Sequence, residues 1–331
     1  MKKKTVLNLF LIIFTCSLLV GCNGKNVDGT NENAGKDIKI IATLFPQYDF
    51  AREIAGDKAD ITLLMSPGVE SHSYEPSPSD IIDINSSDLF IYTGEYMEPW
   101  AQSIIEGMDN KNVKILDVSE NITLDKTGTD HQDEDHDHSD DESEDHSHSD
   151  ADHAAHDYDP HIWTSPVNAK IMVDNILKAL CEIDPENADY YKENAANYNE
   201  KLDELNNEFI DIFATAKRNE IIFGGKFALH YFAEEYGMDY EAAFDSCSTE
   251  TEPSVKVIAQ LIDEIKEKDI PVIYYPELTD PKVAKSISDE TGAEMLLLHS
   301  CHNVSKDEFK AGATYLSLMK QNAENLKIGL N

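Results

Sequence analysis

Short apolar runs alternate with helix-like segments along this chain, and that alternation limits its fold more than any other feature. In the first half the pattern predicts strands at 38–44, 61–65, 89–93 and 114–118, with helices at 47–55, 78–84 and 100–108. Such alternation is typical of an α/β domain with a mainly parallel sheet. Ligands bind such sheets beyond the carboxyl ends of the strands.

The second half repeats this outline. It predicts strands at 220–223, 240–244, 272–275 and 295–298, and helices at 226–236, 255–266 and 281–291. Ser305-x-x-Glu308 is a capping box that opens a long terminal helix.

About fifty helical residues separate the two halves, and their longest apolar stripe lies within 185–218. A helix of that length would span about 50 Å at 1.5 Å per residue. The sequence therefore predicts an α/β protein of two similar domains with mainly parallel sheets, joined by one long rigid backbone helix. A coiled-coil dimer is the alternative, but the stripe covers only about four heptads.

The N-terminus has the features of an exported lipoprotein. Lys2, Lys3 and Lys4 precede an apolar run at 6–20, which is too short to span a membrane comfortably. Leu19-Val20-Gly21-Cys22 resembles a lipobox, in which the cysteine is lipidated; an ordinary signal peptide is the alternative. The predicted segments are a signal peptide at 1–22, a flexible tether at 23–36, an α/β domain at 37–166, linking helices at 167–218 and a second α/β domain at 219–331.

Charge indicates the kind of ligand. The chain has 331 residues and a formal net charge of −37. Nucleic-acid binding needs clustered Lys and Arg, which this chain lacks, so the composition favours cations. An acidic, His-rich loop at 129–158 holds seven histidines among thirteen carboxylates between Asp130 and Tyr158. Its composition predicts a mobile surface loop that binds Zn²⁺, Cu²⁺ or Ni²⁺ loosely, or a merely solvated spacer.

Two histidines outside that loop lie in turns that can direct an imidazole toward a ligand. His72 lies within Gly68–Pro76, directly after the second predicted strand, and His161 lies within Asp159-Pro160-His161-Ile162-Trp163. In the second half, polar clusters also follow strands. They contain Cys247, Glu277, His299, Cys301 and His302. The two halves are therefore expected to present metal ligands at facing strand edges.

These motifs resemble those of the metal-binding receptor lipoproteins of bacterial zinc and manganese ABC transporters, the ZnuA/TroA-like group (periplasmic solute-binding protein family 9). Gly68–Pro76 resembles the first-ligand loop of that family, Tyr92–Trp100 its segment after the third strand and Asp159–Trp163 its second-ligand motif. The acidic, His-rich insert is typical of the zinc-specific members. The resemblance implies two four-stranded α/β domains, a connecting helix and an ion between the domains.

The resemblance also implies a metal ligand set. His72 and His161 match their motifs, and His302 takes the place of an acidic fourth ligand, with His299 beside it. The third-ligand position is occupied by Lys226, whose ammonium has no lone pair for a metal. His230, four residues later on the same predicted helical face, is the replacement, with Cys247 and Glu277 as alternatives.

Cysteines leave a further choice open. Cys247 and Cys301 both follow predicted strands of the second half. They could form a disulfide worth about 4 kcal/mol, or one of them could be a thiolate ligand of zinc. Cys181 lies in an apolar helical stretch and is predicted to be a core residue.

The resulting hypothesis is a receptor, not an enzyme. It captures Zn²⁺, with Mn²⁺ as the second choice because Mn²⁺ prefers more carboxylate oxygen. The expected partners are an ABC transporter permease and ATPase, with a lipid anchor at Cys22 on the extracytoplasmic face of the cell membrane, and the protein is expected to be a monomer. A zinc hydrolase is disfavoured because no His-Glu-x-x-His motif is present. A metal buffer or adhesin built on the His-rich loop is the other alternative.

Overall fold

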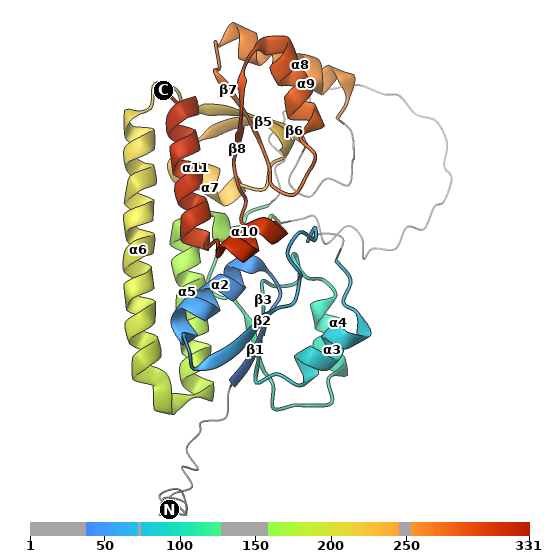
Figure 1. Ribbon diagram of the computed structural model, residues 1–331, viewed down its shortest axis with the longest axis vertical. Coiled ribbons are helices and arrows are strands. Elements are labelled where there is room, and N and C mark those ends of the chain that lie inside the picture. The colour runs from blue at the N-terminus through green and yellow to red at the C-terminus, as the bar shows by residue number, and fades with distance from the viewer. Residues whose placement is uncertain (1–37, 72–73, 127–157, 245–252) are drawn as a thin grey trace, which may run out of the picture. The chain divides into compact units, whose positions relative to one another are not determined.

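Two four-stranded parallel sheets, one from each half of the chain, carry the fold (Figure 1). The computed structural model describes residues 38–71, 74–126, 158–244 and 253–331. The first sheet has the order β2-β1-β3-β4, with β1 (Ile38–Ala42), β2 (Ala59–Leu63), β3 (Leu89–Tyr92) and β4 (Lys114–Asp117). The second has the order β6-β5-β7-β8, with β5 (Glu220–Lys226), β6 (Asp239–Phe244), β7 (Val272–Tyr275) and β8 (Glu294–Leu297). Because the orders correspond, β3 and β7 take equivalent places.

Short helices connect the strands of each sheet. The first half contains α2 (Phe45–Ala55), α3 (Pro78–Asn85) and α4 (Ala101–Gly107). The second contains α7 (His230–Tyr236), α8 (Val255–Glu267), α9 (Lys282–Thr291), α10 (Lys306–Ala311) and α11 (Tyr315–Gly329). The prediction of two similar parallel α/β sheets is confirmed.

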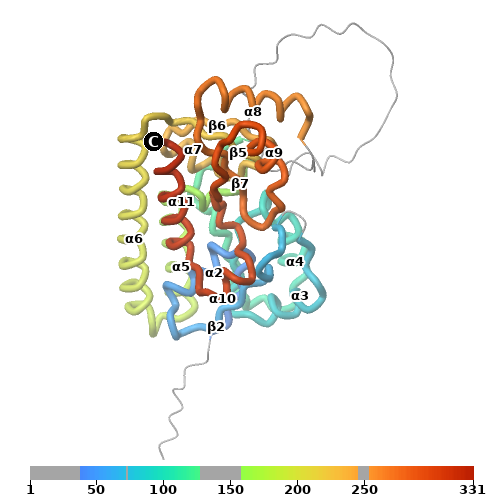
Figure 2. The backbone as a smooth tube through the Cα atoms, turned by 45° about the horizontal axis from the view of Figure 1, so that its top comes forward, coloured from blue at the N-terminus to red at the C-terminus, as the bar shows by residue number. Residues whose placement is uncertain are grey.

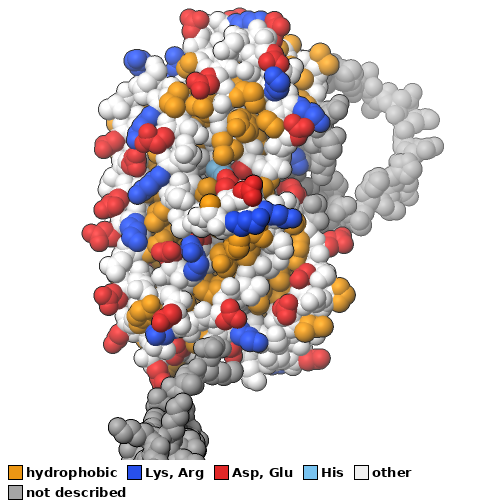
Figure 3. All heavy atoms as spheres, viewed as in Figure 1, with side chains coloured by type: hydrophobic (Ala, Val, Ile, Leu, Met, Phe, Trp, Pro, Cys, Tyr) orange, Lys and Arg blue, Asp and Glu red, His pale blue; other side chains and the backbone are white. Residues whose placement is uncertain are grey.

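A helical hairpin links the halves. α5 (Pro166–Ile183) begins at a proline, and the Ser165 hydroxyl caps it by accepting from the amides of Val167 and Asn168. α6 (Ala188–Thr215) is 28 residues long and runs beside α5 and α11 in both views (Figures 1 and 2). Charged side chains of both signs cover the outer side of these helices (Figure 3). The predicted long helix is confirmed.

One hydrophobic core joins both sheets to this hairpin. It contains Ile40 and Ile91 of the first sheet, Ile221 and Tyr274 of the second, and the buried stripe of α6. That stripe consists of Tyr191, Ala195, Tyr198, Leu202, Leu205, Phe209 and Ile212. Residues 37–331 form one compact unit, and the boundaries predicted between its two domains stay a prediction.

Two predicted helices are wrong in extent. β5 continues through Gly224 and Gly225 to Lys226, because these residues have no side chain and let the strand pack closely against its neighbours. An added Cβ would lie 2.6 Å from Ala284 Cβ at the first position and 2.5 Å from Pro276 Cδ at the second. Helix α7 therefore begins only at His230. The long helix predicted after Ser305 is two helices, because Gly312, at φ 76°, ends α10 in the left-handed region. Thr314 then caps α11.

No helix among the described residues is long and apolar enough to cross a membrane. The signal peptide, Cys22 and the tether lie outside the described residues.

Candidate metal centre

The predicted ligands divide into those that the structure describes and those that it does not. His72, the His-rich loop from 129 to 157 and Cys247 lie outside the described residues. His161, His230, His299 and His302 are described.

His161 is held by the aspartate of its own motif. Asp159 Oδ1 lies 2.8 Å from His161 Nδ1 and accepts from the His161 amide at 2.8 Å. Both side chains are buried. A carboxylate at Nδ1 fixes the proton there, so the lone pair of the neutral ring lies on Nε2, as in carboxylate–histidine–metal sites. The Asp159 carboxylate thus keeps the His161 ring in the orientation that a metal ligand of this type needs.

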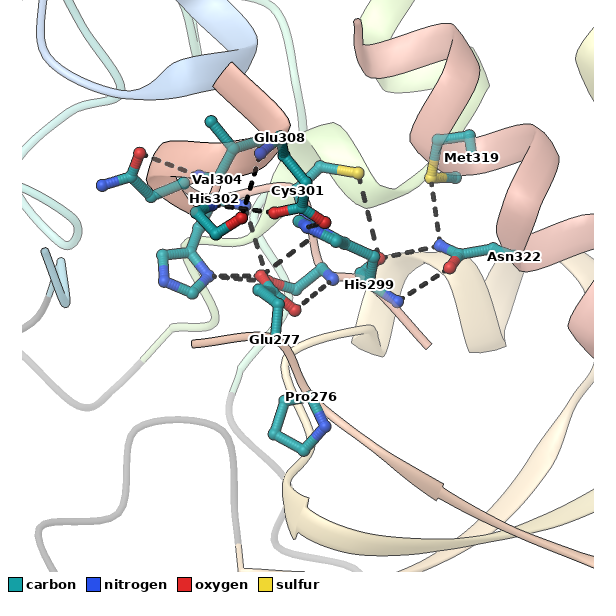
Figure 4. Close-up of polar contacts among 12 residues, drawn as sticks. Pro276, Glu277, His299, Cys301, His302, Val304, Glu308, Met319 and Asn322 are labelled. Carbon is teal, nitrogen blue, oxygen red and sulfur yellow. Dashed lines mark hydrogen bonds and ion pairs between the residues drawn. The ribbon is translucent and has the colours of Figure 1, made fainter. Parts of the chain in front are cut away.

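His302 is held in the same way by Glu277, which follows β7 (Figure 4). Its Nδ1 lies 2.9 Å from Glu277 Oε1 and 2.7 Å from Ser300 Oγ. Its Nε2 is buried and has no hydrogen-bond partner among the described residues. With the proton on Nδ1, the lone pair of the neutral His302 ring lies on this buried Nε2, as in His161.

Glu277 carries the negative charge of this site. Burial alone would raise its pKa, but the His299 and His302 imidazoles and the hydrogen bonds from His302 and Ser300 hold that pKa well below its usual range. Conversely, burial would lower the pKa of His302, but Glu277 raises it above its usual value. Glu277 also accepts from the amide and hydroxyl of Ser300 at 2.9 and 2.6 Å. Because its oxygens are occupied by these donors, Glu277 supports a ligand better than it serves as one.

Two residues beside this pair have left-handed backbone. Leu278 has φ 58° and Cys301 has φ 64°, a region that non-glycine residues rarely adopt. The bend at Cys301 lets Ser300 and His302 both reach Glu277. Such conformations are often found where a fold orients functional side chains.

The surroundings of the Cys301 thiol and of His299 do not favour metal coordination by either group. Cys301 is a free, fully buried thiol, and burial raises its pKa well above the usual value, which disfavours a thiolate ligand. His299 Nδ1 accepts from the Cys301 amide at 2.9 Å, so the proton of the neutral ring is on Nε2. That nitrogen lies 3.9 Å from Glu308 Oε1 and has no lone pair for a metal (Figure 4).

Three separate segments meet at this site. Asn303 Nδ2 donates to the carbonyls of Ser66 and Val69 at 3.0 and 2.9 Å, and Gly68 donates its amide to Val304 at 2.8 Å. These bonds attach the segment that leads to His72 to the His302 loop. Trp163 Nε1 donates to the Ser300 carbonyl at 2.8 Å, which attaches the His161 motif to the same loop. Sequence reasoning places Trp163 in the His161 motif but misses the roles of Trp163 and Asn303, because these depend on long-range contacts.

His230 lies beside the His161 motif. Its Nε2 is 3.6 Å from Asp125 Oδ2. The next residue, Tyr231, donates its hydroxyl to the Asp159 carbonyl at 2.8 Å and accepts from the Asp125 amide at 3.0 Å. The prediction that Lys226 and His230 share one helical face is wrong, because Lys226 ends β5 and residues 227–229 are not helical.

Within the described ranges, no group of three or more His, Cys, Asp or Glu side chains is arranged to hold a metal ion. The described residues supply two imidazoles with a carboxylate at Nδ1, those of His161 and His302, and a third, that of His230, beside the His161 motif.

Two parallel α/β sheets joined by a long helix, with imidazoles held by buried carboxylates on segments bonded to one another, are typical of a class of solute-binding receptors. The family model for the zinc-uptake complex component A, periplasmic (ZnuA), matches residues 40–329. The chain is 35% identical to the high-affinity zinc uptake system protein ZnuA of Bacillus subtilis, over 96% of each chain. The chain belongs to the ZnuA family, whose members are uptake receptors and not enzymes.

Two further comparisons agree with this family. The chain is 32% identical to the zinc-binding lipoprotein AdcA of Streptococcus pneumoniae, over 96% of this chain but only 60% of the length of AdcA. The Zn(II)-bound ZnuA-like domain of AdcA superposes with a TM-score of 0.71 at 28% identity, covering 89% of this chain and 99% of that domain.

Proposed function

We propose that this protein is an extracytoplasmic, high-affinity zinc receptor that captures Zn²⁺ between its two sheets and delivers it to an ABC transporter permease. The observation that carries the proposal is the pair His161 and His302. Each imidazole is held at Nδ1 by a buried carboxylate, which leaves Nε2 as the coordinating atom. The His161 motif is bonded to the loop that carries His302 through Trp163 and Ser300.

The proposed ligands are His72, His161, His302 and His230. The loop that carries His72 is attached to the His302 loop through Asn303 and Gly68. A ligand set dominated by imidazole favours Zn²⁺ over Mn²⁺, which prefers more carboxylate oxygen. The two nearby carboxylates, Asp159 and Glu277, are bonded to imidazoles. The Zn(II)-bound state of the AdcA domain supports the same ion.

The proposed location is the extracytoplasmic face of the cell membrane. Cys22, after signal-peptide cleavage, would carry the lipid, and a monomer would deliver zinc to the permease, which an ATPase drives. The lipobox-like sequence and the name of AdcA, a zinc-binding lipoprotein, support this location. Mass spectrometry of the protein from bacterial membranes tests it: a diacylated N-terminal Cys22 is expected, and an unmodified residue at that end would contradict it.

A metal buffer or adhesin remains the second candidate, because the His-rich loop has many potential ligands. Deletion of residues 130–158 separates the two functions. A receptor keeps one tight zinc site after the deletion, as measured by chelator competition, and loses only weak sites. If the deletion instead abolishes tight binding, the loop is the principal site and the receptor proposal fails.

A further inference from the structure

Glu98 is another fully buried carboxyl, and it has no role in the proposed ligand set. It lies six residues after β3, in the Tyr92–Trp100 segment, and is 1% exposed. The side chains that bond to it carry no charge. They are Thr43, which follows β1, and Gln47 on α2, with the Thr93 amide completing the group.

The donors and acceptors of this group determine where its protons lie. The Leu44 amide donates to Gln47 Oε1 at 2.8 Å, so that oxygen is an acceptor. Thr43 Oγ1 lies 2.7 Å from the same oxygen and is also hydrogen-bonded to Glu98 Oε1. The Thr43 hydroxyl has one proton, and Gln47 Oε1 can only accept it.

An ionised Glu98 would therefore leave two acceptors competing for one proton. If Glu98 Oε1 itself carries a proton, it donates to Thr43 Oγ1, and Thr43 donates to Gln47. The other oxygen, Oε2, still accepts from the Thr93 amide at 2.9 Å. Every polar atom named in this group is then satisfied, as buried groups require.

The electrostatic surroundings agree with a neutral acid. Asp117, at the end of β4, acts on Glu98 by charge repulsion, and the charge of Glu98 in turn acts on the Tyr92 hydroxyl on β3. Burial, first of all, and Asp117 raise the pKa of Glu98 to about 8, although hydrogen bonds from Thr43, Thr93 and Gln47 oppose that rise.

The turn that Glu98 holds also contacts the metal centre. The Phe45 amide donates to the His302 carbonyl at 3.3 Å, and the Thr43 carbonyl accepts from the Met65 amide at 3.2 Å, just before the His72 loop. We propose that Glu98 is a neutral carboxylic acid that positions this turn, and through it the His302 and His72 loops. The effect on zinc rests on the proposed function, whereas the protonation of Glu98 does not.

Glu98→Gln tests the proposal, because glutamine reproduces one donor and one acceptor without titrating. Thermal unfolding of the metal-free protein is measured from pH 5 to 9.5, with infrared spectra at pH 6. The wild type should lose stability relative to Glu98→Gln as pH rises from 5 to about 8. At pH 6 the infrared band of carboxylic-acid C=O groups should be weaker for Glu98→Gln than for the wild type. Parallel unfolding curves and unchanged spectra would overturn the proposal.

Zinc affinity at pH 7 tests the positioning role. Glu98→Gln should bind like the wild type, whereas Glu98→Ala should bind about tenfold more weakly. Equal affinity in a folded Glu98→Ala would refute positioning. If Glu98→Ala does not fold, Glu98→Asp, whose shorter side chain cannot reach both partners, replaces it with the same expected loss. Absence of tight zinc in the wild type would refute the proposed function but leave the unfolding comparison valid.

Discussion

Glu98 and Glu277 are both almost fully buried beyond the carboxyl end of equivalent strands, β3 and β7, yet their pKa values shift in opposite directions. Glu98 is bonded to uncharged groups, which are the Thr43 hydroxyl, the Thr93 backbone amide and the Gln47 side chain, whereas Glu277 also faces two imidazoles. Burial disfavours the charged form at both positions. The partners therefore decide the charge, and the ionised carboxyl is the one that supports a proposed metal ligand.

The largest expected effect comes from removing a ligand on either side. His161→Ala and His302→Ala should each weaken zinc binding by more than about 100-fold, beyond the loss usual for a supporting residue. Chelator competition measures this. Cys181→Ser on α5, away from both imidazole motifs, is the matched control and should bind like the wild type.

The comparison is tested next by replacing each carboxyl group with an amide. Glu277→Gln should weaken zinc binding by about 10- to 100-fold, because an amide orients His302 Nδ1 less strongly than a carboxylate. Glu98→Gln should leave the affinity unchanged. Equal losses in these two variants, measured by calorimetry, would show that the two carboxyls do not differ in role.

The pH dependence of zinc binding sharpens the role of Glu277. Protons compete with zinc for His302. Burial lowers the pKa of His302, but the charge of Glu277, its hydrogen bond to the ring and the charge of Glu70 together raise that pKa above its usual value. Apparent affinity should therefore fall as pH decreases through that raised value. In Glu277→Gln the midpoint should move to lower pH. Titrations from pH 8 to 5 that show the same midpoint in both proteins would contradict this linkage.

In the metal-free protein, Glu98 and Glu277 should make the free energy of unfolding depend on pH in opposite directions. The lowered pKa of Glu277 contributes stability above pH 4.5 that is lost as pH falls toward its folded value. The raised pKa of Glu98 removes stability as pH rises from 4.5 to about 8, on the order of 4 kcal/mol. Urea unfolding of Glu277→Gln against the wild type at pH 3 and pH 6 should show a smaller difference at pH 3. A constant difference would argue against an ionised Glu277.

The smallest expected effects come from the hydroxyl partners. Thr43→Val and Ser300→Ala should each lower the free energy of unfolding by about 1–2 kcal/mol through lost buried hydrogen bonds. Only Ser300→Ala should also shift the pH midpoint of zinc binding, because Ser300 contacts both Glu277 and His302. A shift in Thr43→Val as well would mean that the two networks are coupled.

Much of the fold could be predicted from the sequence, since local patterns determine most elements. Ser165-Pro166 marks the start of α5, and the strands of the first sheet lie within two residues of their predicted bounds. The course of β5 through Gly224 and Gly225 could not be predicted, because it depends on packing against Ala284 and Pro276.

The candidate site divides in the same way. Asp159 lies two residues before His161, so this carboxylate was visible within the motif. Glu277 lies 25 residues before His302, and Glu98 lies 55 residues after Thr43. Both pairs depend on the sheet topology, which brings the ends of distant strands together.

The most direct test of the account is the stoichiometry and affinity of zinc in the purified wild-type protein, His161→Ala and His302→Ala under reducing conditions at pH 7.5. The account predicts one tight Zn²⁺ per chain in the wild type and its loss in both variants. Tight binding retained in full by both variants would contradict the proposed site.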